Sequence, residues 1–436
     1  METLLKILIA VLLFSALVLF HEFGHFLLAK AVGVGVTEFA LGMGPILVSW
    51  GKGETKYAIK ALPFGGSCSM VGEDADDPAP NAFNNKPAWA RFLVVAAGPV
   101  FNFILAFLVS LVLTAAGGLN TPMVNSVTGG SGAEAAGLRQ GDIIRSIGGK
   151  RIYLGRDIMI YELNRPLDGT PLELVYERDG ERHEVLLDTH SSGYRIGISY
   201  NANESACALQ SVSPDSPAEA AGLKVGDVIL AINGTAVAGG NDLQQYLQEH
   251  ALDGSALKLK LGRGDEVLET ELIPAPYETN SLGFDAYFYY DTESLSLGSV
   301  LGCSLAELRY WLEYTFMSLK MLLTGSVGIR DLSGPVGIVE IIGESVDAGM
   351  ESGGIGDALL NLMTMAVLLN VNLGMMNLLP IPALDGGRLI FILFELLTGK
   401  RFPAKWENYV HLAGFILLML LMVAVMFSDV LKLFGR

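Results

Sequence analysis

The chain contains few cysteines and few charged residues. Cysteine occurs at 3 of 436 positions, Cys68, Cys207 and Cys303, and this number and spacing exclude a disulfide framework and a CxxC zinc site. Charged residues make up 17% of the chain against 51% hydrophobic residues, and the net charge is -17. A nucleic-acid partner requires a basic face and is therefore not expected. The composition is typical of a membrane protein that carries soluble domains.

Long apolar runs predict four transmembrane helices. The first, within 1–30, has no small-residue cleavage site after it and is interpreted as a retained span rather than a signal peptide. The others are predicted at 92–116, within 358–399 and at 407–428, whereas the run at 389–397 is too short to cross alone. Lys and Arg gather at 31–91 and 400–405, which places these loops in the cytoplasm and the acidic region 119–357 outside.

The first span contains the motif His21-Glu22-Phe23-Gly24-His25. Residues four apart lie on one face of a helix, so His21 and His25 can bind one zinc ion while Glu22 acts as a base for its bound water. The alternative is a chance match. Ionisable side chains inside a membrane are expensive and mark functional sites, which favours the metal. The active site lies toward the cytoplasmic end of the span.

A third ligand is expected because catalytic zinc sites hold three protein ligands and one water. Asp385 follows the third span in the sequence NLLPIPALDGGRL, where Pro380 and Pro382 break the helix. Asp385 could instead only cap the next helix, and Glu395 is a weaker rival ligand. Asn377 lies nearest this loop and could hold the backbone of a substrate, or it could form an ordinary interhelical hydrogen bond.

Between 38 and 72 the hydrophobic pattern changes from a helical period to that of strands. The segments 46–50 and 56–62 flank the turn 51–54 and predict a membrane-associated β-hairpin. Gly42, Met43 and Gly44 precede it as an irregular, closely approached backbone. An exposed strand edge can hold an extended substrate, although the hairpin could also serve only as a cover.

The acidic region contains an internal repeat, in which 131–152 aligns with 216–237. Each copy carries the pattern A-x-x-A-G-L-x-x-G-D and resembles the PDZ domain, an α+β module that binds extended peptides or chain ends. We place the two copies at 120–202 and 205–276, followed by a linker at 277–357 with an amphipathic helix at 304–325 on the membrane surface. The copies contain no metal-ligand cluster in sequence, so we expect them to restrict access or to act only as a scaffold.

The motifs HEFGH, GMGP, SGPVG (333–337) and NLLPIPALDGG, together with the tandem repeat, resemble the site-2 protease family of intramembrane zinc metalloproteases, in its bacterial RseP-type branch. The resemblance implies zinc bound by His21, His25 and Asp385 and catalysis by Glu22. It also implies substrate contacts at Asn377 and at Gly42, Met43 and Gly44. The implied substrates are transmembrane segments of single-span proteins, such as a pre-trimmed anti-sigma factor, and remnant signal peptides.

These expectations describe a multi-pass α-helical protein of the bacterial inner membrane, with four transmembrane helices, a β-hairpin and two periplasmic PDZ domains. Its partners would be the lipid bilayer and single-span substrates, and the PDZ domains could contact substrate ends or other proteins. The competing hypothesis is a non-proteolytic PDZ adaptor with a structural metal site. Glu22 argues against it, because a structural site has no use for a carboxylate beside its ligands.

Overall fold

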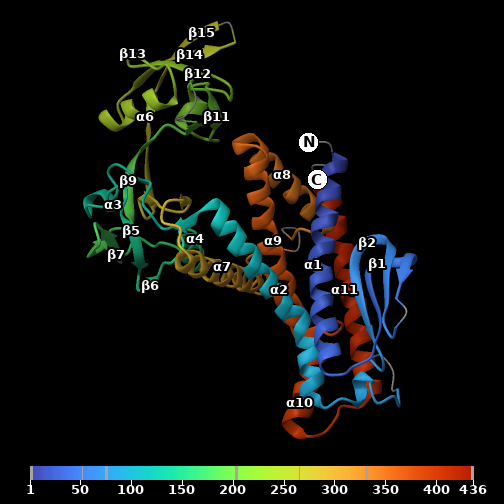
Figure 1. Cartoon of the computed structure of the whole chain (residues 1–436). Helices are drawn as coiled ribbons and strands as arrows, with labels where there is room; N and C mark the ends of the chain where they lie inside the picture. Colours follow the sequence, from blue (N-terminus) through green and yellow to red (C-terminus); the bar gives the residue numbers. More distant parts are fainter. Residues whose placement is uncertain are drawn as a thin grey trace. The chain divides into compact units, whose positions relative to one another are not determined.

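The computed structural model describes residues 3–51, 53–73, 77–201, 205–264, 266–328 and 332–433 (Figure 1). Lys52, in the predicted turn of the hairpin, lies outside these ranges. The chain forms two compact units: Met1–Asn120 with Tyr290–Arg436, and Thr121–Tyr289. We call them the helical unit and the repeat unit.

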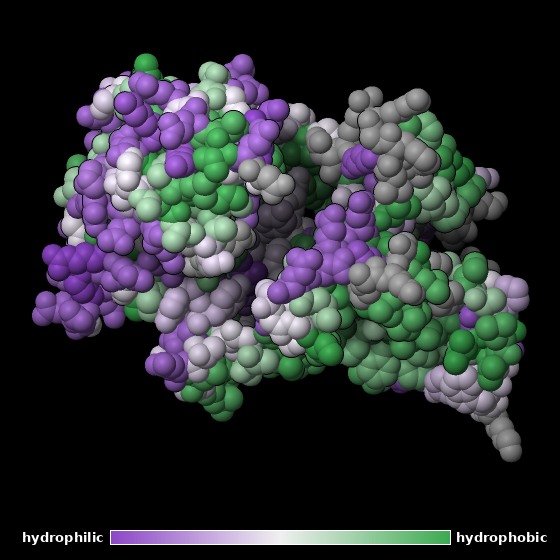
Figure 2. Space-filling model, turned by 90° about the horizontal axis from the view of Figure 1, so that it is seen from above, coloured by the Kyte–Doolittle hydropathy of each residue, from purple (hydrophilic) through white to green (hydrophobic). Residues whose placement is uncertain are grey.

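The helical unit is built around α2, which packs against α1, α7, α9 and α10. Its helices are α1 Thr3–Ala31, α2 Ala88–Gly117, α7 Leu297–Leu323, α8 Pro335–Gly353, α9 Ile355–Leu378, α10 Asp385–Thr398 and α11 Ala404–Leu433. Within the described ranges, four helices are long and apolar enough to cross a membrane: Leu4–Ala31, Ala88–Gly117, Ile355–Leu378 and Tyr409–Asp429. Figure 2 shows hydrophobic residues gathered over the visible surface of these helices.

The region predicted as a linker, 277–357, is mostly regular structure. It contains α7, α8 and three short strands, and α7 starts at Leu297 rather than at 304. The face of α7 that packs on α2 and α9 buries Tyr310 and Trp311. Leu305 and Phe316 of the apolar face assigned to the membrane surface are exposed, at 58% and 63%. Thr315 of α7 also donates a hydrogen bond of 2.5 Å to Asn372 of α9.

The predicted hairpin is present as two long antiparallel strands, β1 Val36–Trp50 and β2 Lys56–Met70. The Gly42–Gly44 tract lies inside β1, where the register with β2 shifts repeatedly. Gly42 and Gly44 have φ of 86° and 84°, and a Cβ at Gly42 would collide with the carbonyl oxygen of Leu62. These glycines therefore permit bulges that bend the hairpin.

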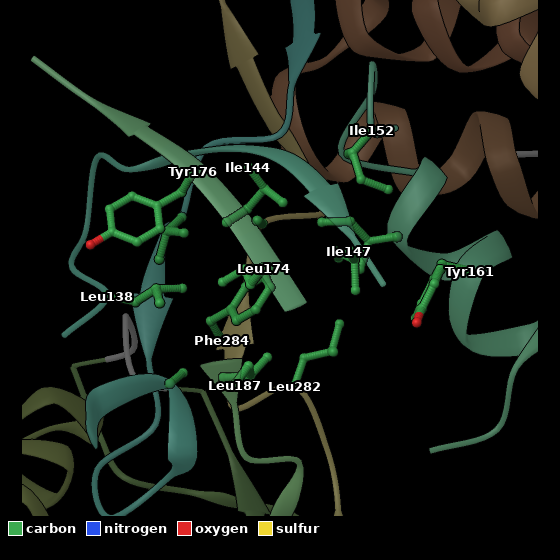
Figure 3. Packing of buried hydrophobic residues seen from close by; sticks show 14 residues of the cluster. Leu138, Ile144, Ile147, Ile152, Tyr161, Leu174, Tyr176, Leu187, Leu282 and Phe284 are labelled. Atoms are coloured by element: carbon green, nitrogen blue, oxygen red, sulfur yellow. The ribbon is translucent and has the colours of Figure 1, made fainter. Parts of the chain in front are cut away.

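The repeat unit contains two four-stranded sheets of the same topology, β6-β5-β7-β8 and β13-β12-β14-β15. The first sheet consists of β5 Ile143–Ile147, β6 Lys150–Arg151, β7 Leu172–Arg178 and β8 Glu181–Leu187; the second consists of β12 Val228–Ile232, β13 Thr235–Ala236, β14 Leu257–Arg263 and β15 Glu266–Leu272. Their helices are α3 Gly132–Ala135 and α4 Asp157–Asn164, then α5 Pro217–Ala220 and α6 Gly240–Glu249. Figure 3 shows the core of the first repeat, with Ile144 and Leu174 at its centre. In the second core, burial raises the pKa of the Cys207 thiol to about 11, so this cysteine is a core residue without nucleophilic character.

The two repeats exchange strands, so the predicted boundaries 120–202 and 205–276 differ from the structure. Phe284–Asp285 (β17), which follows the second repeat, pairs with Ser126–Val127 (β4) and contributes Phe284 to the first core. Ile198–Tyr200 (β10), which follows the first repeat, pairs with Leu209–Val212 (β11) of the second. Between them His190–Arg195 (β9) pairs with Ala275–Asn280 (β16). Strands this short carry too little periodicity to be assigned to a partner from sequence.

The Gly-Asp pair shared by both repeats has a structural role. The Asp142 side chain is 1% exposed, accepts a hydrogen bond from the backbone of Arg139, and pairs with Arg178 at 2.7 Å. Asp227 repeats this arrangement with Lys224 and Arg263, and the Arg263 guanidinium lowers the pKa of the Asp227 carboxyl. Each aspartate thus joins a turn to the third strand of its own sheet.

Candidate metal centre

Three side chains converge in the helical unit: His21 and His25 on α1, and Asp385, the first residue of α10. The two Nε2 atoms of the histidines are 3.2 Å apart, and they lie 3.2 and 3.4 Å from Oδ2 of Asp385. Both histidines are buried, at 6% and 8% exposure. The spacing of four residues on α1 places both rings on one face, as the sequence predicted.

The size of this triangle fits a zinc ion. Zinc in proteins is tetrahedral with bonds to nitrogen and oxygen of about 2.0–2.1 Å, which sets neighbouring ligand atoms about 3.3 Å apart. The three measured edges, 3.2, 3.2 and 3.4 Å, match that value. Three ligands leave the fourth tetrahedral position for water, as in catalytic sites.

Helix α2 holds the two imidazole rings from behind. Nδ1 of His25 lies 2.9 Å from the carbonyl oxygen of Val94. Because that oxygen can only accept, Nδ1 carries the proton and Nε2 keeps a lone pair that can bind a metal. Nδ1 of His21 lies 3.1 Å from the amide of Asn102, a residue with 0% exposure. The atom that faces the ring is Nδ2 of Asn102. The same amide turned by 180° would present Oδ1 to an N–H at Nδ1 of His21 and leave Nε2 for a metal.

The close approach of α1 and α2 depends on two glycines. A Cβ on Gly98 would collide with Nε2 of His25 and lie 2.7 Å from Cε1 of His21. A Cβ on Gly24 would lie 2.5 Å from the carbonyl oxygen of Ala97. Without these side chains the backbone of α2 can lie directly against the histidines.

Asp385 reaches the histidines because the chain folds back on itself after α9. A Cβ on Gly386 would collide with the carbonyl oxygens of Leu378 and Leu379, and one on Gly387 would lie 2.5 Å from that of Ile381. Leu384, not Asp385, is the N-cap of α10. The predicted alternative that Asp385 only caps α10 therefore does not apply. Glu395, the other residue considered as a ligand, pairs with Arg91 of α2 at 2.5 Å.

A cavity of about 180 Å³ opens on the triangle, and its lining includes Glu22, Asn377, Cys68, Glu73 and Arg388. Glu22 is therefore beside the predicted ligands, and Asn377 reaches the same space. Arg388 and Glu73 form an ion pair that joins α10 to the segment after β2. Among the described residues, the lining does not include Gly42, Met43 or Gly44.

Sequence reasoning missed the residues that support the ligands. Asn102 carried a usable signal, since an amide within an apolar span requires a partner. Val94 carried none, because it contributes only its backbone.

Two histidines and a carboxylate around an open position, with a free glutamate beside them, define a metal-dependent hydrolase. The scaffold of long apolar helices makes it a membrane protein. The chain belongs to peptidase family M50, the site-2 protease family of zinc metalloproteases, whose sequence model matches residues 9–421. Its cofactor is zinc.

Relatives and solved structures are similar to this chain over different shares of its length. The chain is 30% identical over 454 residues to the zinc metalloprotease RasP of Geobacillus kaustophilus, with 99% of each chain covered. It is 28% identical over 464 residues to the RasP of Shouchella clausii, with 100% of each covered. A crystal structure of the HtrA3 PDZ domain bound to a phage-derived ligand is 25% identical over 20% of this chain and 91% of that chain, with a TM-score of 0.18.

We predict that Gly98→Ala weakens zinc binding about tenfold or more, because the added methyl group displaces both imidazoles. Gly117→Ala on the same helix is the matched control, since its Cβ would meet Leu360 only at 3.4 Å. Competition with a chelator on the purified proteins measures both affinities. Equal zinc affinity in Gly98→Ala and Gly117→Ala would contradict the packing described here.

Proposed function

We propose that the protein hydrolyses peptide bonds within the transmembrane segments of single-span membrane proteins. In this proposal His21, His25 and Asp385 bind the zinc ion and Glu22 is the catalytic base. The observation that carries it is the triangle of three ligand atoms, with edges of 3.2–3.4 Å, two of them on a helix apolar enough to cross a membrane. Family membership and the names of the relatives support the reaction class.

Bound zinc supplies a water of lowered pKa and polarises the scissile carbonyl. Glu22 lines the same cavity and takes the proton from that water, then passes it to the leaving amine. Val94 and Asn102 hold the imidazoles in the orientation that directs both Nε2 atoms at the metal. Asn377 lies at the cavity wall, where its amide can hold the backbone of a substrate strand.

The substrate must reach this cavity as an extended strand, because a helix seals its own peptide bonds. The hairpin offers exposed apolar side chains, among them Met43, Ile46, Leu47 and Trp50, and a two-stranded sheet with open edges. We assign Gly42, Met43 and Gly44 to the outer part of this path and Asn377 to its inner end. Suitable substrates are a pre-trimmed anti-sigma factor and remnant signal peptides.

The repeat unit is proposed to act as a pair of PDZ domains that restrict access. Its two sheets share one topology, and its cores are separate from the metal site of the helical unit. With the enzyme in the inner membrane and the repeats in the periplasm, a folded pair would exclude substrates with bulky external domains.

The alternative, a non-proteolytic adaptor with a structural metal site, requires that Glu22 have no chemical role. A structural zinc site normally has four protein ligands, whereas the described residues bring three together here. The open position and the cavity favour the enzyme.

Two changes from carboxylate to amide are predicted to have opposite effects on the metal. Glu22→Gln should abolish cleavage and retain zinc, because the amide has the same shape but cannot accept the proton. Asp385→Asn should lose both, because a neutral amide is a poorer ligand. Zinc content and cleavage of a membrane-embedded model substrate are measured on both proteins. Retained activity in Glu22→Gln, or full zinc content in Asp385→Asn, would refute the assigned roles.

Removal of the repeat unit is predicted to release the restriction on substrate size. The deletion must span 121–289, because a cut at 276 would leave Leu282, Phe284 and Ala286 without the core in which they are buried. The assay compares two substrates that have the same transmembrane segment. The long one carries a folded external domain, and the short one carries only a stub. We expect the ratio of long to short cleavage rates to rise at least tenfold. If short substrates instead stop being cut, the repeats recruit substrates.

A further inference from the structure

The loop before Asp385 contains a residue in a backbone conformation that its type disfavours. Ala383 has φ of 75°. The other non-glycine residues with positive φ in the described ranges are Asp179, Asp215 and Asn233 of the repeat unit. Asp and Asn adopt this left-handed region with local hydrogen bonds, whereas the Cβ of alanine disfavours it. An outlier of this kind persists only where its surroundings impose it.

Helix α11 supplies the group that imposes the left-handed conformation on Ala383. The backbone N–H of Ala383 donates a hydrogen bond of 2.9 Å to Nδ1 of His411. The His411 ring also lies 5.8 Å, centroid to centroid, from the ring of Phe391 on α10. One turn further along α11, a Cβ on Gly414 would lie 2.5 Å from the carbonyl oxygen of Pro382. The last apolar helix thus packs directly on the loop, and His411 bonds its strained peptide.

The position of this peptide determines where Asp385 points. Ala383, Leu384 and Asp385 all line the cavity, and only Leu384 separates the strained residue from the carboxylate. If Ala383 relaxed to negative φ, the following peptide would rotate and the Asp385 carboxylate would move from its position 3.2 Å from His21.

We propose that His411 is a positioning residue that holds Ala383 in its left-handed conformation and so keeps the Asp385 carboxylate beside Nε2 of both histidines. This rests on the proposed role of Asp385 as a zinc ligand. Among the described residues that line the cavity, His411 does not appear, and it acts through the backbone of the loop.

Two substitutions separate the hydrogen bond from the bulk of the side chain. In His411→Asn, Oδ1 stands as many bonds from the backbone as Nδ1 of histidine and can accept the same N–H. His411→Leu places a methyl group there and suits an apolar helix, so it should fold. We expect His411→Leu to weaken zinc affinity about tenfold, measured by chelator competition, and His411→Asn to stay within about twofold of the parent protein. Cleavage by His411→Leu at saturating zinc should show a lower kcat with an unchanged KM.

A further substitution, at Ala383 itself, tests the contribution of the backbone strain. Glycine adopts positive φ without cost, so Ala383→Gly should restore most of the zinc affinity lost in His411→Leu. Equal affinity of His411→Leu and the parent protein would overturn the proposal. The proposal would also be overturned if His411→Asn lost as much zinc affinity as His411→Leu. It would be overturned too if His411→Leu lowered zinc affinity by the same factor whether residue 383 is Ala or Gly.

Failure of this inference can be distinguished from failure of the proposed function. If Asp385→Asn loses zinc while His411→Leu does not, only the positioning role is wrong. If Asp385→Asn retains zinc, the ligand assignment itself is wrong.

Discussion

The structure depends on keeping three polar ligand atoms together inside a region that is otherwise apolar. Buried imidazoles and a partly buried carboxylate are costly unless each is fixed and paired. The unit meets this requirement with α2, which offers the carbonyl oxygen of Val94 to one ring and the amide of Asn102 to the other. Gly98 contributes by having no side chain, since any Cβ there would occupy the space of the rings. The position of α2 at the centre of the unit follows from this role.

Asp385 is held by a loop rather than by a long helix, and a different set of contacts fixes its position. Two glycines allow the chain to fold back after α9, and one alanine is held in a strained conformation. Packing from α11 and its hydrogen bond to Ala383 compensate for that strain. The ion pair of Arg388 with Glu73 connects α10 to the segment after the hairpin strand β2, and that of Arg91 with Glu395 connects α10 to α2. The loop is thus held from three sides.

The sequence was sufficient to find the residues that the structure gathers at the candidate site, because polar motifs inside apolar segments are easy to recognise. His21, His25, Asp385, Glu22 and Asn377 were all predicted, and the structure brings all five to one cavity. The hairpin and the repeated α+β topology were also expected. The assignment of the ligand roles remains a prediction.

Other features could not be predicted, for physical reasons. The exchange of β10 and β17 between the repeats depends on long-range pairing of strands of two or three residues, which have no detectable period. Val94 and Ala383 contact histidine rings through their backbones, so the identity of their side chains does not indicate these contacts.

The most direct test of the account is X-ray absorption spectroscopy at the zinc edge on the purified protein. We predict two imidazole nitrogens and further nitrogen or oxygen ligands at about 2.0–2.1 Å, without sulfur. A sulfur ligand at about 2.3 Å would contradict the account. It would assign the metal to Cys68, which lines the same cavity, in place of one member of the triangle formed by His21, His25 and Asp385.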